Sequence, residues 1–264
     1  MSSPIITLLT DFGLQDGYVA SMKGVILQIC PDAKLVDISH LIPAQNIRSG
    51  AFVLYSSYDN FPNGTIHLAV VDPGVGTQRG AVAIRTNSFF FVGPDNGLFS
   101  LILRKEAKWE ARRLENSQFL RSPVSNTFHG RDLFAPVAAH LASGVDFHTL
   151  GPACDLMFPR WGEPIAGRGE VRGEVIHIDR FGNAITNVPG EILEKQGPPC
   201  KWSIRAGELT IDSIQQTYGR AGAGEALALT GSSGFIEIAV NQGNAASELK
   251  LEQGTVVSFR LGGF

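Results

Sequence analysis

The sequence predicts an α/β N-terminal domain with a layered, mostly parallel sheet, followed by a smaller all-β C-terminal domain. In the first part of the chain, apolar strand-like runs alternate with segments of helical periodicity, which is typical of a layered α/β domain. In the second part, short β-rich runs follow one another with turn residues between them, which is typical of a sandwich or a barrel. We expect the domains at residues 1–160 and 171–264, joined by a Pro/Gly-rich linker over residues 161–170.

The first strand is expected at residues 5–10, because the near-continuous apolar run IITLLT is typical of a parallel strand covered on both faces. A helix follows and ends before Pro31. Its apolar stripe consists of Val19, Met22, Ile26 and Ile29. Apolar patterning predicts further strands at 34–39, 65–71, 81–86 and 89–93, a turn at 93–97, and helices at 47–57 and 131–142.

The second half contains seven expected strands separated by turn residues. They lie at 173–179, 184–188, 200–207, 208–214, 226–231, 235–240 and 256–261.

Composition excludes several classes of protein. Of 264 residues, 44% are hydrophobic and 18% charged, which is ordinary for a globular chain, and the formal charge of −3 offers no electrostatic footprint for nucleic acid or anionic lipid. No apolar run reaches the roughly 20 residues of a membrane helix, and the N-terminus lacks the basic flank and cleavage site of a signal peptide. Cys30, Cys154 and Cys200 form no metal-binding or disulfide pattern. We therefore expect a cytoplasmic protein with reduced thiols and no nucleic-acid or membrane partner.

The run VVDPGVGTQRG, residues 70–80, has the glycines of a phosphate-binding loop but not its chemistry. Such a loop needs a Lys followed by Ser or Thr and disfavours a carboxylate beside the anion, whereas this run carries Asp72 and Arg79. Asp11 follows the first strand in the same way, at the edge where open α/β sheets bind ligands. His129 is expected at the start of a helix in NTFHGRD.

Each of these residues also has a structural explanation. Asp11 and Asp72 fit as caps of the next helix or turn, and Arg79 fits as a solvated surface charge. His129 fits as a hydrogen-bond partner at a helix start. The six histidines show no HxH or HxxxH spacing, so we expect no metal site.

Taken in order, the segments TDFG, DPGVG with its following Arg, TFHGRD, DRFGN and SSGFIEIAVNQGNAA resemble the S-adenosyl-L-methionine hydroxide adenosyltransferases. These are relatives of the halogenases that attack S-adenosylmethionine with fluoride or chloride. The resemblance runs from residue 5 to about residue 262. It implies a C-terminal β-barrel and a homotrimer whose active sites lie between the N domain of one subunit and the C domain of its neighbour.

The resemblance also implies roles for individual residues. Asp72, Arg79 and His129 match the set that activates water, and Asp11 matches the carboxylate that grips the ribose hydroxyls. The C-domain positions that match substrate-binding residues are Asp179, Phe181, Asn183, Ser232, Ser233, Glu237, Asn244 and Ala245. The implied reaction converts S-adenosyl-L-methionine and water into adenosine and L-methionine, with no cofactor. We expect the glycines to let the turn after Asp72 approach the substrate closely.

Three departures from the halogenases favour water as the nucleophile. Asp72 replaces a tyrosine, Gly130 occupies the position that helps to hold the halide, and Gln45 replaces a tryptophan that walls the pocket. A carboxylate beside the nucleophile repels an anion but suits a water that must lose a proton. The alternatives are a halide-dependent adenosyltransferase and a non-catalytic module that binds adenosine or S-adenosylmethionine.

Overall fold

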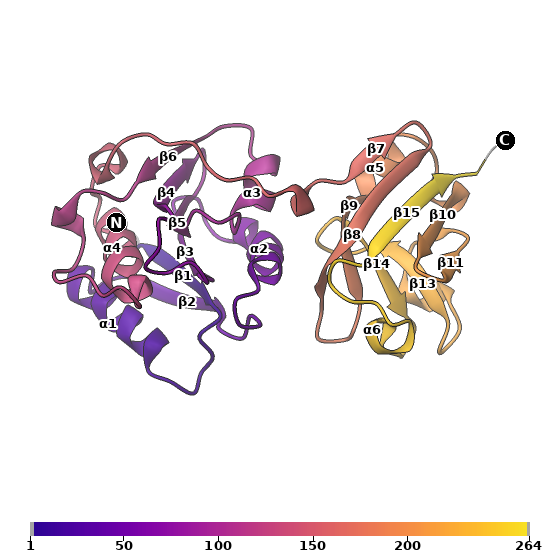
Figure 1. Ribbon diagram of the computed structural model, residues 1–264, viewed down its shortest axis with the longest axis horizontal. Coiled ribbons are helices and arrows are strands. Elements are labelled where there is room, and N and C mark those ends of the chain that lie inside the picture. The colour runs from indigo at the N-terminus through magenta and orange to yellow at the C-terminus, as the bar shows by residue number, and fades with distance from the viewer. Residues whose placement is uncertain (1–2, 263–264) are drawn as a thin grey trace. The chain divides into compact units, whose positions relative to one another are not determined.

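The computed structural model describes residues 3–262 and divides the chain into two compact units, Met1–Pro159 and Arg160–Phe264 (Figure 1). The first unit is a mixed α/β unit and the second is built mainly of strands.

A six-stranded sheet with the order β2-β1-β3-β5-β4-β6 forms the first unit. Neighbours among β2, β1, β3 and β5 pair in parallel, whereas β4 is antiparallel to both β5 and β6, so the sheet is mostly parallel as expected. Its strands are β1 (Ile5–Thr10), β2 (Lys34–Ser39), β3 (Ile66–Val70), β4 (Ala81–Thr86), β5 (Phe90–Pro94) and β6 (Trp109–Arg113).

Helices cover both faces of this sheet, with α1 and α4 on one side and α2 and α3 on the other (Figure 1). The helices are α1 (Tyr18–Ile29), α2 (Ile47–Tyr55), α3 (Ser100–Lys105) and α4 (Ala135–Ala142). Met22 and Ile26 of α1 pack with apolar residues of α4 against the strands, and both are fully buried. This burial explains the near-continuous apolar runs of the central strands.

The structure corrects the expected elements at several points. The helix expected at 131–142 begins with a π-helical turn, Gly130–Phe134, before α4, and the helix expected at 47–57 ends at Tyr55. Neither α3 nor β6 was expected. Six residues are too few for helical periodicity to be visible in α3. The edge strand β6 contains three charged residues, which hide its strand character.

The second unit has a nine-stranded, nearly closed barrel-like sheet, with β7 pairing beside the path β11-β10-β15-β8-β9-β14-β13-β12. A buried core around Trp202, Phe259 and Ile236 fills its interior. Its elements are β7 (Ile165–Gly167), β8 (Glu170–Ile178), β9 (Ala184–Pro189), α5 (Gly190–Glu194), β10 (Trp202–Ala206), β11 (Leu209–Ile211), β12 (Ile214–Gln215), β13 (Ala226–Thr230), β14 (Phe235–Val240), α6 (Ala245–Glu248) and β15 (Val256–Leu261).

Two expectations for this unit are corrected. Residues 161–170 include β7, which pairs with β8, so this segment takes part in the sheet instead of being only a linker. The single strand expected at 208–214 is divided into β11 and β12, which lie at the two ends of the strand path.

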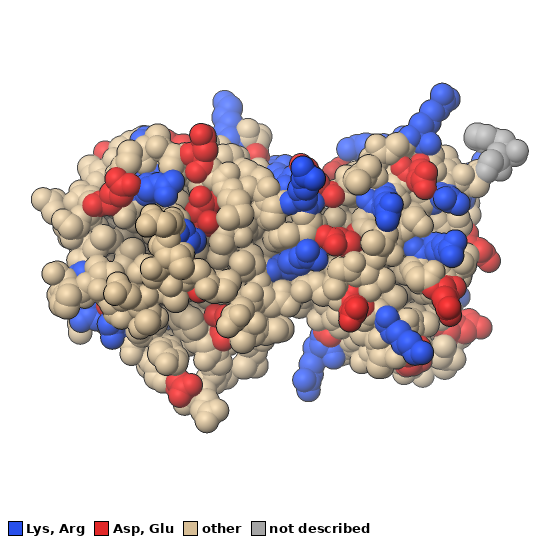
Figure 2. Space-filling model, viewed as in Figure 1, with Lys and Arg blue, Asp and Glu red and all other residues tan. Residues whose placement is uncertain are grey.

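Charged side chains of both signs are interspersed on the face shown in Figure 2. Within residues 3–262, no helix has both the length and the apolar character needed to cross a membrane.

His67 on β3 is a fully buried histidine inside an aromatic cluster. Its ring stacks on Phe91 with a centroid distance of 5.1 Å and meets Phe89 at 5.3 Å, while Nδ1 lies 2.8 Å from the Thr7 hydroxyl. Burial lowers the pKa of His67 to about 3, because the apolar surroundings disfavour the imidazolium.

We predict that His67 makes the fold sensitive to acid. Its folded pKa lies below the ordinary value of about 6.5, so its stabilising contribution is present above pH 6.5 and is lost as the pH falls toward 3. The full loss is on the order of 5 kcal/mol. Urea unfolding measured from pH 7 to pH 4.5 should show a weaker dependence on pH for His67→Gln than for the unmodified chain, and equal slopes would contradict this origin.

Candidate active site

Asp72, Arg79 and His129 come together in the first unit from two separate segments. Asp72 lies two residues after β3, and Arg79 lies just before β4. His129 immediately precedes the π-helical turn, so its expected place at a helix start is confirmed. The side chains of Asp72 and Arg79 are only 5% and 7% exposed, so they form a nearly buried ion pair.

The guanidinium of Arg79 connects the other two side chains. Its Nε donates to Oδ1 of Asp72 at 3.0 Å, and its Nη2 donates to Oδ2 at 2.5 Å. The same Nη2 lies 2.9 Å from Nδ1 of His129. Because arginine remains protonated, it must be the donor in this contact, so Nδ1 accepts and neutral His129 carries its proton on Nε2.

Electrostatics favour this neutral form. The pKa of His129 lies below its ordinary value because burial disfavours the imidazolium and the charge of Arg79 repels it. The negative charges of Asp72 and Asp132 oppose this shift without reversing it. At neutral pH the imidazole of His129 is therefore uncharged.

The glycine-rich turn between Asp72 and Arg79 packs against the segment that carries His129. Gly76 has φ +75°, and a Cβ there would lie 2.4 Å from the carbonyl oxygen of Asn126. We expected the glycines to serve close approach of the substrate, but at Gly76 the close approach is to Asn126. This glycine therefore sets the distance between the two segments of the site.

Asp132 fixes the segment around His129 from the other side. It is 1% exposed and accepts hydrogen bonds from Arg131 Nε at 2.7 Å and from the backbone N–H of Ser125 at 2.9 Å. Burial acts to raise the pKa of Asp132, but these hydrogen bonds and the nearby arginine charges hold it below its ordinary value. Since Ser125 and Asp132 lie on either side of His129, the carboxylate closes the loop that presents the imidazole.

Asp11 lies directly after β1, as expected, and β1 is the parallel neighbour of β3. Its Oδ2 accepts the backbone N–H of Gln45 at 2.7 Å. Gln45 has φ +65°, a conformation that is uncommon for a residue other than glycine. This strained residue holds the Asp11 carboxylate in place, which is consistent with the clustering of strain at functional sites.

In the second unit, Asp179 organises the turn between β8 and β9. Its Oδ1 accepts the backbone N–H groups of Phe181 at 2.9 Å and Asn183 at 2.8 Å, and its Oδ2 accepts the side-chain amide of Asn183 at 2.9 Å. Phe181 projects from this turn and is 75% exposed. Gly182 packs so closely on Asn244 that a Cβ would lie 2.2 Å from the amide carbon of Asn244.

Glu237 joins this cluster through a residue that sequence reasoning missed. Tyr218 donates its hydroxyl to Glu237, and the amide of Asn183 reaches the same hydroxyl at 3.5 Å. Burial raises the pKa of Glu237, assisted by the charge of Asp179 and opposed by the hydrogen bond from Tyr218. No sequence motif marked Tyr218, because its partners lie 19 and 35 residues away along the chain.

The remaining expected residues flank β14, the strand that carries Glu237. Ser232 and Ser233 occupy the turn between β13 and β14, after Gly231, where a Cβ would lie 2.2 Å from the Glu237 carboxylate. Asn244 caps α6 by accepting the backbone N–H of Ser247, and Ala245 is the buried first residue of that helix. The expected residues thus fall into two groups: Asp11, Asp72, Arg79 and His129 lie in the first unit, and a polar set lies in the second.

No group of three or more His, Cys, Asp or Glu side chains able to hold a metal ion occurs between residues 3 and 262. Asp72 in particular already accepts two hydrogen bonds from Arg79.

Comparison with known proteins assigns both halves of the chain. Residues 6–151 match the family model described as the SAM hydroxide adenosyltransferase N-terminal domain, and residues 173–258 match the model of its C-terminal domain. An (R)-S-adenosyl-L-methionine hydrolase from Thermus thermophilus is 38% identical over 260 residues, covering 96% of this chain and 98% of that protein.

More distant similarity extends to the halogenases, since a fluorinase from Nocardia brasiliensis is 28% identical over 295 residues, covering 98% of this chain and 97% of that protein. The crystal structure of an uncharacterized conserved protein from Thermotoga maritima superimposes with a TM-score of 0.88 at 36% identity. That match covers 96% of this chain and 99% of the Thermotoga chain.

We predict that Gly76→Ala displaces the turn and impairs the site. The new methyl group meets the Asn126 carbonyl, and the positive φ adds about 1 kcal/mol of strain. Gly64→Ala is the matched control, because Gly64 also has a positive φ, +87°, but open space around its Cβ position. Urea unfolding and turnover should both be more strongly reduced in Gly76→Ala, and equal effects in the two variants would show that the contact with Asn126 is unimportant.

Proposed function

Because this chain belongs to the SAM hydroxide adenosyltransferase family, we propose that it is an enzyme that hydrolyses S-adenosyl-L-methionine to adenosine and L-methionine. The hydrolase from Thermus thermophilus, which matches nearly the whole chain, supports this reaction. The observation that carries the proposal is the buried contact of Arg79 with both Asp72 and His129.

The substrate explains why such a set is useful. The C5′ carbon of S-adenosylmethionine is bonded to a sulfonium, so the leaving group departs as a neutral thioether and needs no acid. Free water, with a pKa of about 15.7, is the poor partner in this reaction. The catalytic task is therefore to orient a water and take its proton as its oxygen bonds to C5′ and the C5′–sulfur bond breaks.

The tautomer of His129 assigns complementary roles within the set. Nδ1 accepts from Arg79, so Nε2–H of the neutral ring is a donor. Asp72 keeps unused lone pairs beyond the two that Arg79 occupies, so it is the acceptor for the proton of water. Arg79 holds both groups and provides positive charge beside the developing hydroxide. This chemistry requires no cofactor or metal ion.

Two other functions fit the chain less well. A halide-dependent adenosyltransferase would place an anion beside the Asp72 carboxylate, which repels it. A non-catalytic module that binds adenosine or S-adenosylmethionine has no use for a nearly buried Asp72–Arg79 pair joined to His129.

We propose that the remaining matched residues bind the substrate. Asp11 holds the ribose hydroxyls, and the polar set of the second unit contacts the adenosine and methionine parts. That set consists of Asp179, Phe181, Asn183, Ser232, Ser233, Glu237, Asn244 and Ala245.

The proposed assembly is a homotrimer, and the proposed location is cytoplasmic. Exposed apolar side chains near Asp11, namely Leu14 and Leu41 at 71% each, support coverage by a neighbouring subunit.

Replacing Asp72 with Asn should lower turnover by roughly two to four orders of magnitude, the usual worth of positioned acid–base help. Chromatography of S-adenosylmethionine incubated with the protein measures adenosine and methionine directly. Asp72→Asn combined with His129→Ala should be little worse than either change alone, because residues that act as one unit are not additive. Near-normal turnover of Asp72→Asn with a collapse of substrate affinity would make Asp72 a binding group and refute its role in activating water.

Turnover should fall in acid with a midpoint below the ordinary histidine value of about 6.5, because burial and the charge of Arg79 lower the pKa of His129. Protonation places an N–H opposite the Arg79 donor and breaks their hydrogen bond. The pH profile of kcat measures this, and His129→Gln should lack this limb because glutamine does not titrate. Persistence of the same limb in His129→Gln would assign it to another group.

Light scattering should give three times the subunit mass of 28.4 kDa. Leu41→Ser should weaken the assembly because it removes apolar surface that we propose to be covered. Leu27→Ser is the matched control, since Leu27 is 43% exposed on α1 and is not part of the proposed contact. A fully active monomer would contradict the trimer.

A further inference from the structure

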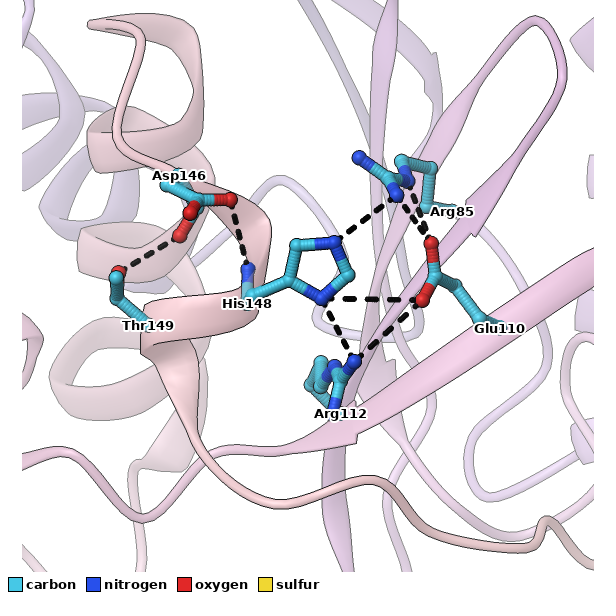
Figure 3. Close-up of polar contacts among 6 residues, drawn as sticks. All are labelled: Arg85, Glu110, Arg112, Asp146, His148 and Thr149. Carbon is cyan, nitrogen blue, oxygen red and sulfur yellow. Dashed lines mark hydrogen bonds and ion pairs between the residues drawn. The ribbon is translucent and has the colours of Figure 1, made fainter.

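A second polar cluster lies at the end of the first unit's sheet opposite to Asp72 and Arg79. It comprises Arg85 of β4, Glu110 and Arg112 of β6, and His148, which follows Phe147 in a short 3-10 turn (Figure 3). Arg79 precedes β4, whereas Arg85 lies near its other end. At about 3.3 Å per residue, these positions are on the order of 20 Å apart. The reaction proposed above leaves this cluster without a role.

The cluster contains more hydrogen-bond donors than acceptors. Nη2 of Arg112 lies 2.7 Å from Nδ1 of His148, and Nη2 of Arg85 lies 3.2 Å from Nε2 of the same ring. A neutral imidazole accepts at only one nitrogen, so one arginine N–H must face another N–H, whichever tautomer is present. In addition, the buried Nε of Arg112 has no partner.

Glu110 is the carboxylate that pairs with both of these arginines. Its Oε1 accepts from Nε of Arg85 at 2.8 Å and also from Nη2, while Oε2 lies 3.5 Å from Nη2 of Arg112. Asp146 caps the backbone N–H of His148 at 3.1 Å and is thereby directed to the turn (Figure 3). One negative charge thus serves two arginines. A buried donor without an acceptor is unfavourable, so the cluster would be stabilised by an added acceptor.

An open pocket of about 470 Å³ adjoins the cluster and adds further donors. It shares Arg85 and Glu110 with the cluster, and its other lining residues are Thr86, Asn87, Lys108 and Trp109. Lys108 is exposed and, within the part of the chain that the structure describes, has no ion pair. One guanidinium nitrogen of Arg85 also points away from Glu110 without a contact to the residues drawn in Figure 3.

We propose that this pocket binds a small oxyanion group, a phosphate or a carboxylate, through Lys108 and Arg85, with Arg112 supplying additional positive charge. Arginine forms paired hydrogen bonds to both kinds of group, and lysine adds a point charge. Phe147 fixes the two guanidinium groups, whose central carbons lie 5.1 Å and 6.0 Å from its ring centroid. The site is separate from the proposed catalytic set, so its occupation does not require S-adenosylmethionine.

Isothermal titration of the full-length protein with inorganic phosphate, at constant ionic strength, tests this site. Acetate titrated in parallel distinguishes a phosphate site from a carboxylate site. We expect saturable binding of one of these anions, and a loss of about tenfold in affinity in Lys108→Gln from removal of one charged contact. Lys34→Gln is the matched control, because Lys34 is an exposed lysine on the opposite edge strand, β2.

Glu110→Gln provides a test in the opposite direction. Removing its negative charge should tighten anion binding severalfold, whereas a merely structural disturbance of the cluster would weaken it. Lys108→Gln should leave the turnover of S-adenosylmethionine unchanged, which separates this site from the catalytic one. Absence of saturable binding of both anions, or equal affinities in Lys108→Gln and Lys34→Gln, would overturn the proposal.

Discussion

The guanidinium of Arg79 is the constraint on which the proposed catalytic set of Asp72, Arg79 and His129 depends. Its Nε and Nη2 donate hydrogen bonds to the two carboxylate oxygens of Asp72. The same Nη2 also donates to Nδ1 of His129. These contacts fix the position of the carboxylate and the tautomer of the imidazole together. Because the Asp72–Arg79 pair is nearly buried, loss of either partner leaves an uncompensated charge, which is strongly unfavourable.

Packing around this ion pair maintains its geometry. Gly76 brings the turn after Asp72 against Asn126, and Asp132 closes the loop that carries His129. The ring of Phe134 in the π-helical turn lies 5.3 Å from the guanidinium carbon of Arg79. Rigid support of this kind suits a reaction in which the enzyme must orient a water before its proton is removed, since a preorganised site needs little rearrangement during the reaction.

Much of the fold could be predicted because local patterns agree with tertiary burial. The run IITLLT is a central parallel strand, and Asp11 and Asp72 follow neighbouring strands as expected. The edge strand β6 was missed because only one of its residues, Ala111, is buried. Tyr218 was missed for a different reason: its link between Asn183 and Glu237 is created by folding and leaves no pattern in the sequence.

The most direct test of attack by water at C5′ is to run the reaction in H₂¹⁸O with chloride present. The nucleoside product is then analysed by mass spectrometry. Attack of water at C5′ predicts adenosine with one ¹⁸O in its 5′-hydroxyl group, and unlabelled methionine. A 5′-chlorinated nucleoside would identify a halide adenosyltransferase instead. Adenosine without ¹⁸O would contradict attack by solvent water at C5′.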